Sequence, residues 1–220
     1  MNKKQIIRIP FLLCMAALCI FLSAGCRYDP PEGYTSKHHT YEELVEFAKQ
    51  IDPNAEVTNT PEVTNEDYRE FIIYPAVING YKCSVASHSR NIYDADLGEF
   101  AKWFYRMDTD YDYYVILDVL KDHPRLGSIE KSDISMRFQV NDVISSTVSV
   151  SSMTEQEFED LYKEFESMRK DLEKYSLRKS YWLQMKAGDS KYYFSDTTSE
   201  GKLKVYEKMA ADGIIKISET

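Results

Sequence analysis

Four stretches of the chain carry apolar residues at the three- and four-residue spacing of an amphipathic helix. Three of them open with Thr or Asp followed three residues later by Glu, which is a capping-box pattern. The last stretch runs up to Gly213, a residue type that closes many helices. These patterns predict helices that begin near Thr40, Asp96, Thr154 and Ser199 and extend to about Ile51, Phe104, Lys174 and Ala211.

The clearest strand pair spans residues 68–87 and turns at Asn79-Gly80, a dipeptide that favours a type I′ hairpin. A two-residue loop pairs Ile78 with Tyr81, and this register brings apolar residues together on one face of both strands. Pro75 then occupies a position whose N–H would point away from the partner strand. Its strand is therefore expected at the outer edge of the sheet, at least locally.

Further strands are expected in the second half of the chain. Residues 111–121 are rich in aromatic and branched side chains and fully apolar at their centre, which predicts a central strand. Residues 134–140 and 144–150 alternate between apolar and polar and predict two half-buried strands joined by a loop at 141–143. Two more strands, near 181–186 and 191–195, flank Gly188-Asp189.

This order of elements, mostly hairpins with interspersed helices, predicts an α+β fold. Three to four amphipathic helices are expected on one face of a largely antiparallel sheet. Residues 40–220 have the length of a single domain and enough apolar side chains to form a core.

The first 26 residues have a different organisation. Basic residues at positions 3, 4 and 8 precede an apolar run over 11–22, which is too short to span a bilayer as a helix. The run ends in Leu22-Ser23-Ala24-Gly25-Cys26. This leader resembles the lipobox signal peptide of bacterial lipoproteins, and an ordinary secretory peptide that happens to contain a cysteine is the alternative.

The resemblance implies that a diacylglyceryl group is attached to the Cys26 thiol and that the leader, residues 1–25, is cut off between Gly25 and Cys26. Two acyl chains would anchor the protein durably to the extracytoplasmic face of a bacterial cell membrane. Residues 26–39 contain Pro30-Pro31 and Gly33 without apolar periodicity, so we expect a flexible tether. Fully extended, its 13 residues after Cys26 would reach about 40 Å at ~3.3 Å each.

The net charge limits the classes of binding partner, and the cysteine content limits the possible disulfides. The chain has a formal charge of −9; loss of three basic residues with the leader leaves 24 basic against 36 acidic residues, a charge of −12. Such a surface repels nucleic acid and anionic polymers, so nucleic acid is not an expected partner. Beyond Cys26, Cys83 is the only cysteine, which leaves no internal disulfide, and the hairpin register places it on the apolar face as a buried thiol.

Three groups of residues have side chains of the types used in metal binding or catalysis. Asp108, Asp110 and Asp112 resemble the opening of a calcium loop, but Tyr113 replaces the turn glycine and Val119 the bidentate glutamate. We therefore expect these carboxylates to cap a connection and face water. The adjacent histidines at 38–39 are expected to lie in a solvated linker. His88 is expected at the end of a strand, hydrogen-bonded to a neighbouring serine.

Tyrosine is the one residue type in excess, with 17 copies. Clusters at 111–114 and 192–194, together with Trp103 and Trp182, suggest stacking platforms for sugars or an aromatic protein interface. Most of these rings are nevertheless expected in the core and at its rim, because half-buried strands favour aromatic residues.

The sequence as a whole predicts a lipid-anchored, extracytoplasmic domain that acts by binding an unidentified partner, expected to be a protein. No catalytic, cofactor-binding or metal-binding residue is assigned. A small cell-surface hydrolase whose residues converge only in the fold, and an immunity or inhibitor lipoprotein directed at a basic target, are the alternatives.

Overall fold

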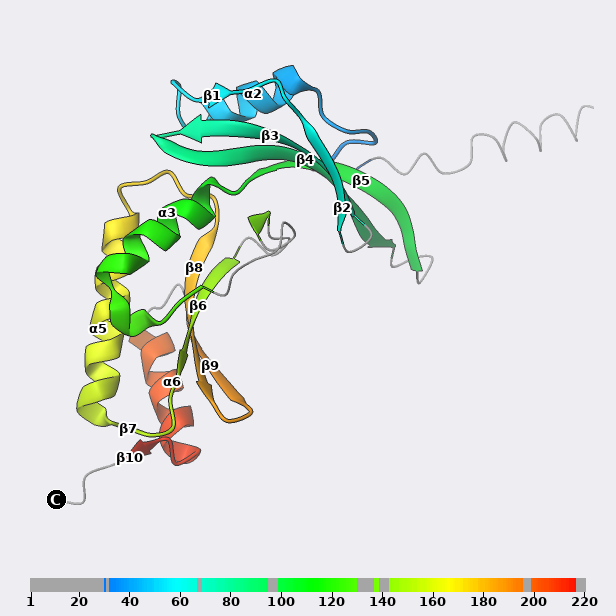
Figure 1. Ribbon diagram of the computed structural model, residues 1–220. Helices are drawn as coiled ribbons and strands as arrows, with labels where there is room; N and C mark the ends of the chain where they lie inside the picture. Colours follow the sequence, from blue (N-terminus) through cyan, green and yellow to red (C-terminus); the bar gives the residue numbers. More distant parts are fainter. Residues whose placement is uncertain are drawn as a thin grey trace, which may run out of the picture.

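The computed structural model describes residues 30, 32–66, 69–94, 99–129, 137–138, 143–195 and 199–216, which form the predicted α+β fold (Figure 1). The leader with Gly25 and Cys26 lies outside this part of the chain. Within it, no helix combines the length and the apolar character that crossing a membrane requires.

The first sheet is antiparallel and curled. It comprises β1 (Glu56–Val57), β2 (Glu62–Glu66), β3 (Arg69–Ile78), β4 (Tyr81–Asp94) and β5 (Glu99–Thr109). The strand order is β1-β3-β4-β5, and β2 also pairs with β3. Helix α2 (Tyr41–Lys49) lies along this sheet and contributes Leu44, Phe47 and Ala48 to the core (Figure 1).

The predicted hairpin is confirmed, with Ile78 opposite Tyr81 across the turn. Asn79 and Gly80 both have positive φ, +49° and +79°, as a type I′ turn requires. The prediction for Pro75 holds only locally, because β3 is an inner strand between β4 and the pair β1 and β2. Pro75 lies between the β1 and β2 ladders, where its missing N–H is not needed and its carbonyl accepts from the Thr58 N–H.

The second sheet contains β6 (Val143–Ser149), β8 (Ser180–Ala187) and β9 (Ser190–Phe194), in the order β6-β8-β9. Strand β8 pairs in parallel with β6 and antiparallel with β9. A parallel pair needs a crossover, which α5 (Glu155–Leu172) supplies. Two short strands, β7 (Met153–Thr154) and β10 (Ile215–Lys216), also pair in parallel.

Helices α3 (Tyr111–Val119), α5 and α6 (Ser199–Ala211) lie on one side of the second sheet (Figure 1). The 3-10 turns η1 (Leu120–Asp122) and η2 (Pro124–Leu126) follow α3. The predicted helix after Thr154 is confirmed with its capping box, and the last predicted helix is confirmed as α6, which ends at Ala211, two residues before Gly213 with its φ of +72°.

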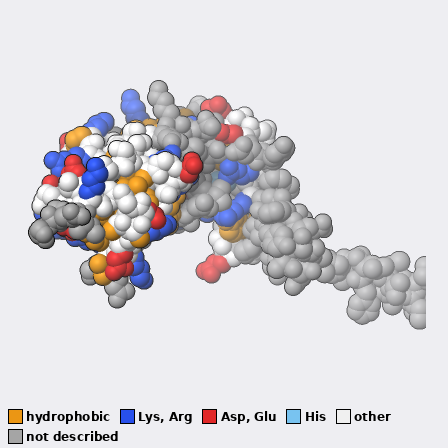
Figure 2. All heavy atoms as spheres, turned by 90° about the horizontal axis from the view of Figure 1, so that it is seen from below, with side chains coloured by type: hydrophobic (Ala, Val, Ile, Leu, Met, Phe, Trp, Pro, Cys, Tyr) orange, Lys and Arg blue, Asp and Glu red, His pale blue; other side chains and the backbone are white. Residues whose placement is uncertain are grey.

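Seen from below, acidic, basic and apolar side chains are interspersed over the described part of the surface (Figure 2). The negative charge of the chain is therefore not gathered on this face.

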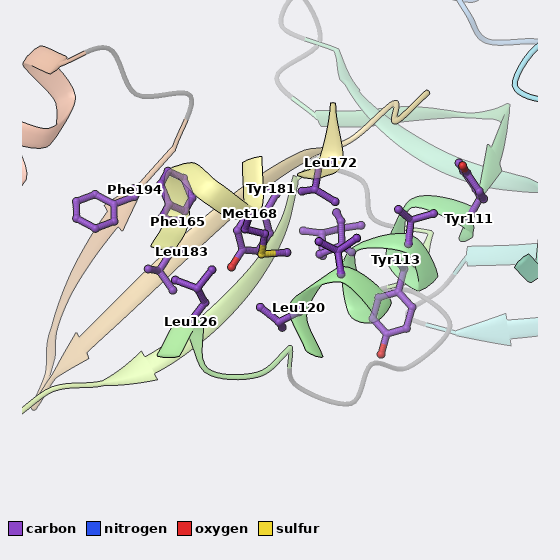
Figure 3. Close-up of a cluster of buried hydrophobic side chains, with 14 of the residues drawn as sticks. Tyr111, Tyr113, Leu120, Leu126, Phe165, Met168, Leu172, Tyr181, Leu183 and Phe194 are labelled. Carbon is purple, nitrogen blue, oxygen red and sulfur yellow. The ribbon is translucent and has the colours of Figure 1, made fainter. Parts of the chain in front are cut away.

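One continuous core joins both sheets and the helices between them. Phe165 and Met168 of α5 pack with Tyr181, Leu183 and Phe194 of the second sheet (Figure 3). Full burial of each such side chain contributes roughly 1.5–3 kcal/mol. A second, smaller cluster of Phe71, Ile73, Ala86 and Phe138 covers the opposite face of the first sheet.

Two element predictions were wrong. Residues 99–104 form part of strand β5 and not the helix expected after Asp96, because β4 provides a ladder partner along this aromatic segment. Residues 111–119 form helix α3 and not a central strand. A short apolar run fits a buried helix as well as a buried strand, and α3 is buried around most of its circumference.

The predicted pair of strands over 134–150 is only partly observable. Strand β6 confirms the second strand, but Val143, expected in the loop, is its first residue. Most of the first predicted strand and residues 141–142 lie outside the described residues.

The chain packs against the first sheet before α2 begins. Thr35 pairs with Tyr105 of β5 through both backbone hydrogen bonds, of 2.8 and 2.9 Å. His38 and His39 contact Ser87 of β4. Residues 35–39, assigned from sequence to the tether, therefore lie on the sheet.

Candidate functional site

The three aspartates of the suspected calcium loop are buried at the junction of the two sheets, so the expectation that they face water was wrong. Asp108 Oδ1 lies 3.3 Å from Nζ of Lys179, the residue before β8. Asp108 Oδ2 lies 3.6 Å from Arg106 Nη2 and 3.7 Å from His88 Nε2. Burial opposes ionisation of Asp108. The contact with His88 and the charges of Lys179 and Arg106 outweigh it and hold the pKa of this carboxyl below its usual value.

The other two carboxylates are held by backbone N–H groups. Asp110 accepts from the Ser84 N–H, and Asp112 Oδ2 accepts from the N–H groups of Arg178 and Lys179 at 2.8 and 2.7 Å. Burial, partly offset by these hydrogen bonds and by nearby cations, raises the pKa of both carboxyls to about 6.

This cluster ties β5 and the start of α3 to the start of β8, and Lys179 Nζ completes the tie by donating to the carbonyls of Thr109 and Arg137. In the described part of the chain, no three His, Cys, Asp or Glu side chains are grouped to hold a metal ion. The hydrogen bonds and the ion pair that join Asp108 and Asp112 to Lys179 fit a structural junction between the sheets.

His88 and Cys83 both lie inside the first sheet. His88 is fully buried within β4, not at a strand end as expected, and its ring stacks on Phe71 at 5.2 Å. Cys83 is buried on the apolar face, as its hairpin register predicted, and burial raises the pKa of its thiol to about 12. Neither side chain has the exposure that a nucleophile or a general base needs.

His38 lies between a serine and a carboxylate. Its Nδ1 is 3.0 Å from Ser87 Oγ and its Nε2 is 3.1 Å from Glu70 Oε2, so the histidine has a fixed geometry and is not solvated linker. The order Ser, His, carboxylate is that of a hydrolase triad. Ser87, however, has no exposed surface, and its Oγ already accepts from the His39 N–H at 2.9 Å. The contacts fasten residues 35–39 to the sheet.

A cleft of about 450 Å³ runs beside the start of α5 and contains two carboxylates, Glu157 and Asp160. Glu157 is engaged in the capping box with Thr154. Asp160 accepts from Gln156 and lies 3.9 Å from Arg125. Both carboxylates are thus engaged in local contacts.

Most tyrosines of the two predicted clusters are core residues, including Tyr111, Tyr113 and Tyr192. Tyr193 is different, because it is 40% exposed and lies on the face of the second sheet that points away from α5 and α6. The ring of Trp182 lies 6.2 Å from that of Tyr193, in an edge-to-face arrangement. The indole N–H of Trp182 has no hydrogen-bond partner within the described structure.

Polar side chains surround these two rings. The register places Ser145 beside Trp182, and Thr147 beside Gln184, whose amide donates to the Thr147 hydroxyl at 3.3 Å. Alternation along the strands puts all of these side chains on one partly exposed surface. We call it the open face; its members are Ser145, Thr147, Trp182, Gln184, Lys186, Lys191 and Tyr193.

Sequence reasoning named Trp182 and the 192–194 cluster but did not place them on a common surface. A signal was present, because alternation from a two-residue turn at Gly188-Asp189 pairs residue 184 with 193. The α5 and α6 side chains that cover the opposite face decide which side stays exposed. Comparison of the chain with protein-family models, curated proteins and solved structures finds no match.

Proposed function

We propose that this protein is a lipid-anchored, extracytoplasmic binding module and that the open face of its second sheet is the binding surface. The observation that carries the binding role is the pair Trp182 and Tyr193, two large rings left partly exposed in a sheet whose other face is largely buried. Exposed aromatic side chains of this kind supply contact area at low conformational cost, which is why they are enriched at binding surfaces.

The lipid anchor rests on the lipobox resemblance of residues 22–26. The Cys26→Ser protein should accumulate as an unprocessed precursor that still carries residues 1–25, because the peptidase of that pathway requires a lipidated cysteine. Labelling with a radioactive fatty acid and the mass of the purified protein test this. Normal cleavage and acyl labelling of the variant would contradict the anchor.

Binding can be tested with isolated cell envelope, separated into polysaccharide and membrane-protein fractions. One of these fractions should retain the wild-type protein. Trp182→Ala and Tyr193→Ala should each weaken that retention roughly tenfold or more, as the loss of a central aromatic anchor does at interfaces. Val63→Ala is the matched control, because Val63 is an exposed apolar residue on β2 of the other sheet. Retention that is equal in all three variants, each with the wild-type circular dichroism spectrum, would refute a role of the open face.

The hydrolase alternative has one specific observation in its favour, the contacts of His38 with Ser87 and Glu70. We expect no turnover of ester, peptide, phosphate or glycan substrates, because Ser87 is buried. Hydrolysis that disappears in both Ser87→Ala and Glu70→Gln, with the fold intact, would replace the binding proposal by the enzyme.

A further inference from the structure

Strands β1 and β2 pair one after the other with the same side of β3 and form an outer edge of the first sheet. Across the two-residue turn, Ile78 and Tyr81 are a hydrogen-bonded pair, so the even-numbered residues of β3 bond to β4. The odd-numbered residues of β3 therefore direct their N–H and C=O groups to β1 and β2. The carbonyl of Pro75 agrees with this direction, because it accepts from the Thr58 N–H on that side.

The same counting shows which backbone groups of β2 point away from β3. The even-numbered residues of β2 lie opposite the odd-numbered residues of β3 and bond inward, so the N–H and C=O groups of Val63 and Asn65 point outward. Among the described residues, none bonds to these outward groups. On β1, by contrast, the Val57 carbonyl accepts from the Tyr41 hydroxyl of α2 at 2.8 Å (Figure 1). Within the described structure, the edge is thus capped along β1 and open along β2.

An open strand edge is a template for another extended chain, and the side chains around it decide which chain fits. Glu42, Glu56 and Glu62 lie on α2, β1 and β2; all three are exposed, and none forms an ion pair with another described residue. Strand β2 itself contains two glutamates and no basic residue. Two copies of β2 side by side would therefore repel, whereas a basic segment would be attracted.

We propose that the outer edge of β2 accepts an extended, basic segment of a partner protein, which adds a strand to the first sheet. The backbone of this segment bonds to the outward N–H and C=O groups of Val63 and Asn65, as in other cases of strand addition. A basic side chain opposite Glu62 adds a cross-strand charge pair. This edge is separate from the open face, so the inference does not rest on the proposed function.

The probe for the test is a fluorescein-labelled nonapeptide, Ser-Thr-Arg-Val-Thr-Val-Arg-Thr-Ser, whose two arginines share one face of an extended strand. With an arginine opposite Glu62, its valines lie opposite Val63 and Asn65. Fluorescence anisotropy with the full-length lipidated protein in detergent measures the affinity. Glutamine in place of both arginines should weaken binding by roughly 2- to 5-fold, the range of a cross-strand charge pair. N-methylation of both valines should weaken it by about tenfold or more, because the outward carbonyls then lose their donors.

Variants of β2 test the same contacts from the side of the protein. Asn65→Pro removes an N–H that the ladder with β3 does not use, so the sheet should form while peptide binding falls by about tenfold or more. Asn65→Ala is the matched control, because it keeps this N–H, and Val63→Ala should likewise bind as wild type does. Glu62→Gln should weaken binding of the arginine peptide by roughly 2- to 5-fold and leave binding of the glutamine peptide unchanged.

Equal peptide binding by Asn65→Pro and Asn65→Ala, both with the wild-type circular dichroism spectrum, overturns the proposal. If Asn65→Pro does not fold, equal affinities for the methylated and unmethylated peptides overturn it instead. Equal affinities for the arginine and glutamine peptides refute a basic partner. A dimer of the protein alone in sedimentation equilibrium, absent in Asn65→Pro, assigns the edge to a second copy and refutes the partner protein. Trp182→Ala should not change peptide binding, and a loss there would move the peptide to the open face.

Discussion

Asp110 and Asp112 have no exposed surface, yet each retains hydrogen bonds from backbone N–H groups. These bonds stabilise the ionised carboxylates, while burial disfavours them more strongly. Asp108 has two cations and a histidine around it, and its pKa is lowered because these contacts outweigh the effect of burial. At the scale of single residues, the number of charge partners thus decides the sign of the pKa shift.

The first prediction concerns stability against pH. Because the folded-state pKa of Asp110 and Asp112 is raised to about 6, their protonated forms favour folding below pH 4, and this contribution is lost as pH rises through 6. The loss amounts to roughly 3 kcal/mol for each carboxyl as an upper limit. Asp112→Asn should flatten the decline in unfolding free energy between pH 4.5 and 7, measured with urea.

Asp189→Asn, a change at an exposed turn, should leave the decline unchanged. Asp108 acts in another window, because its lowered pKa adds stability that is lost only as pH falls below about 4. A pH profile of Asp112→Asn identical to that of wild type would contradict the assignment.

The second prediction concerns Cys83. Burial raises the pKa of its thiol to about 12, so almost no thiolate forms at neutral pH and bulky reagents cannot reach the sulfur. With Cys26 lipidated, the mature protein should react with a chromogenic disulfide reagent only after denaturation. Rapid labelling of the native protein, absent in Cys83→Ser, would show that this part of the core is open.

At the scale of elements, capping boxes mark where α2 and α5 begin. Thr40 and Thr154 each accept from the N–H of a glutamate three residues on, and that glutamate accepts in return from the threonine N–H. Helix α3 begins without such a cap, because the Asp110 side chain bonds to Ser84 instead. Capped starts were visible in the sequence, whereas α3 depends on its surroundings.

The third prediction is therefore that Thr154→Ala costs about 1 kcal/mol, the usual value of an N-cap. This should lower the melting temperature by roughly 2–4 °C for a domain of this size. Ser151→Ala is the control, since Ser151 is exposed and precedes the helix. Equal melting temperatures for the two variants would mean that the cap of α5 contributes nothing.

At the scale of the whole molecule, the contacts of residues 35–39 shorten the stretch that was predicted to be a tether. If Cys26 holds the lipid, eight residues separate it from Thr35, and their fully extended length would be about 26 Å at ~3.3 Å each. An anchored first sheet would then lie closer to the membrane than a tether ending at Thr40 would allow.

The fourth prediction tests this attachment. Ser87→Ala leaves the His39 N–H and His38 Nδ1 without the Ser87 hydroxyl, which costs about 1–3 kcal/mol and should open the segment. Trypsin cleavage after the exposed Lys37 should then accelerate by roughly 5- to 100-fold, since cleavage follows the open population. The rate of this cleavage is followed by the masses of the fragments. Ser84→Ala, on the opposite face of β4, is the control. An unchanged rate would show that Ser87 does not hold the segment.

Short-range patterns in the sequence determined the elements whose signals are local. The capping boxes at Thr40 and Thr154 and the turn at Asn79-Gly80 each depend on residues within four positions of one another. Such a pattern does not by itself decide the element, because Glu99 of the similar pair Asp96 and Glu99 lies in strand β5, where β4 pairs with it. The pairing of Gln184 with Tyr193 could likewise be derived by counting along β8 and β9 from the turn at Gly188-Asp189.

The tertiary structure alone decided the segments that depend on distant partners. Residues 99–109 became a strand because β4 lies beside them, and residues 111–119 became a helix because apolar neighbours surround them. Lys179 is 71 positions from Asp108, and Ser87 is 49 from His38, so neither contact could be derived from spacing. The exposure of Trp182 and Tyr193 likewise followed from α5 and α6 covering the other face, because burial depends on which surfaces meet and not on the order of residues.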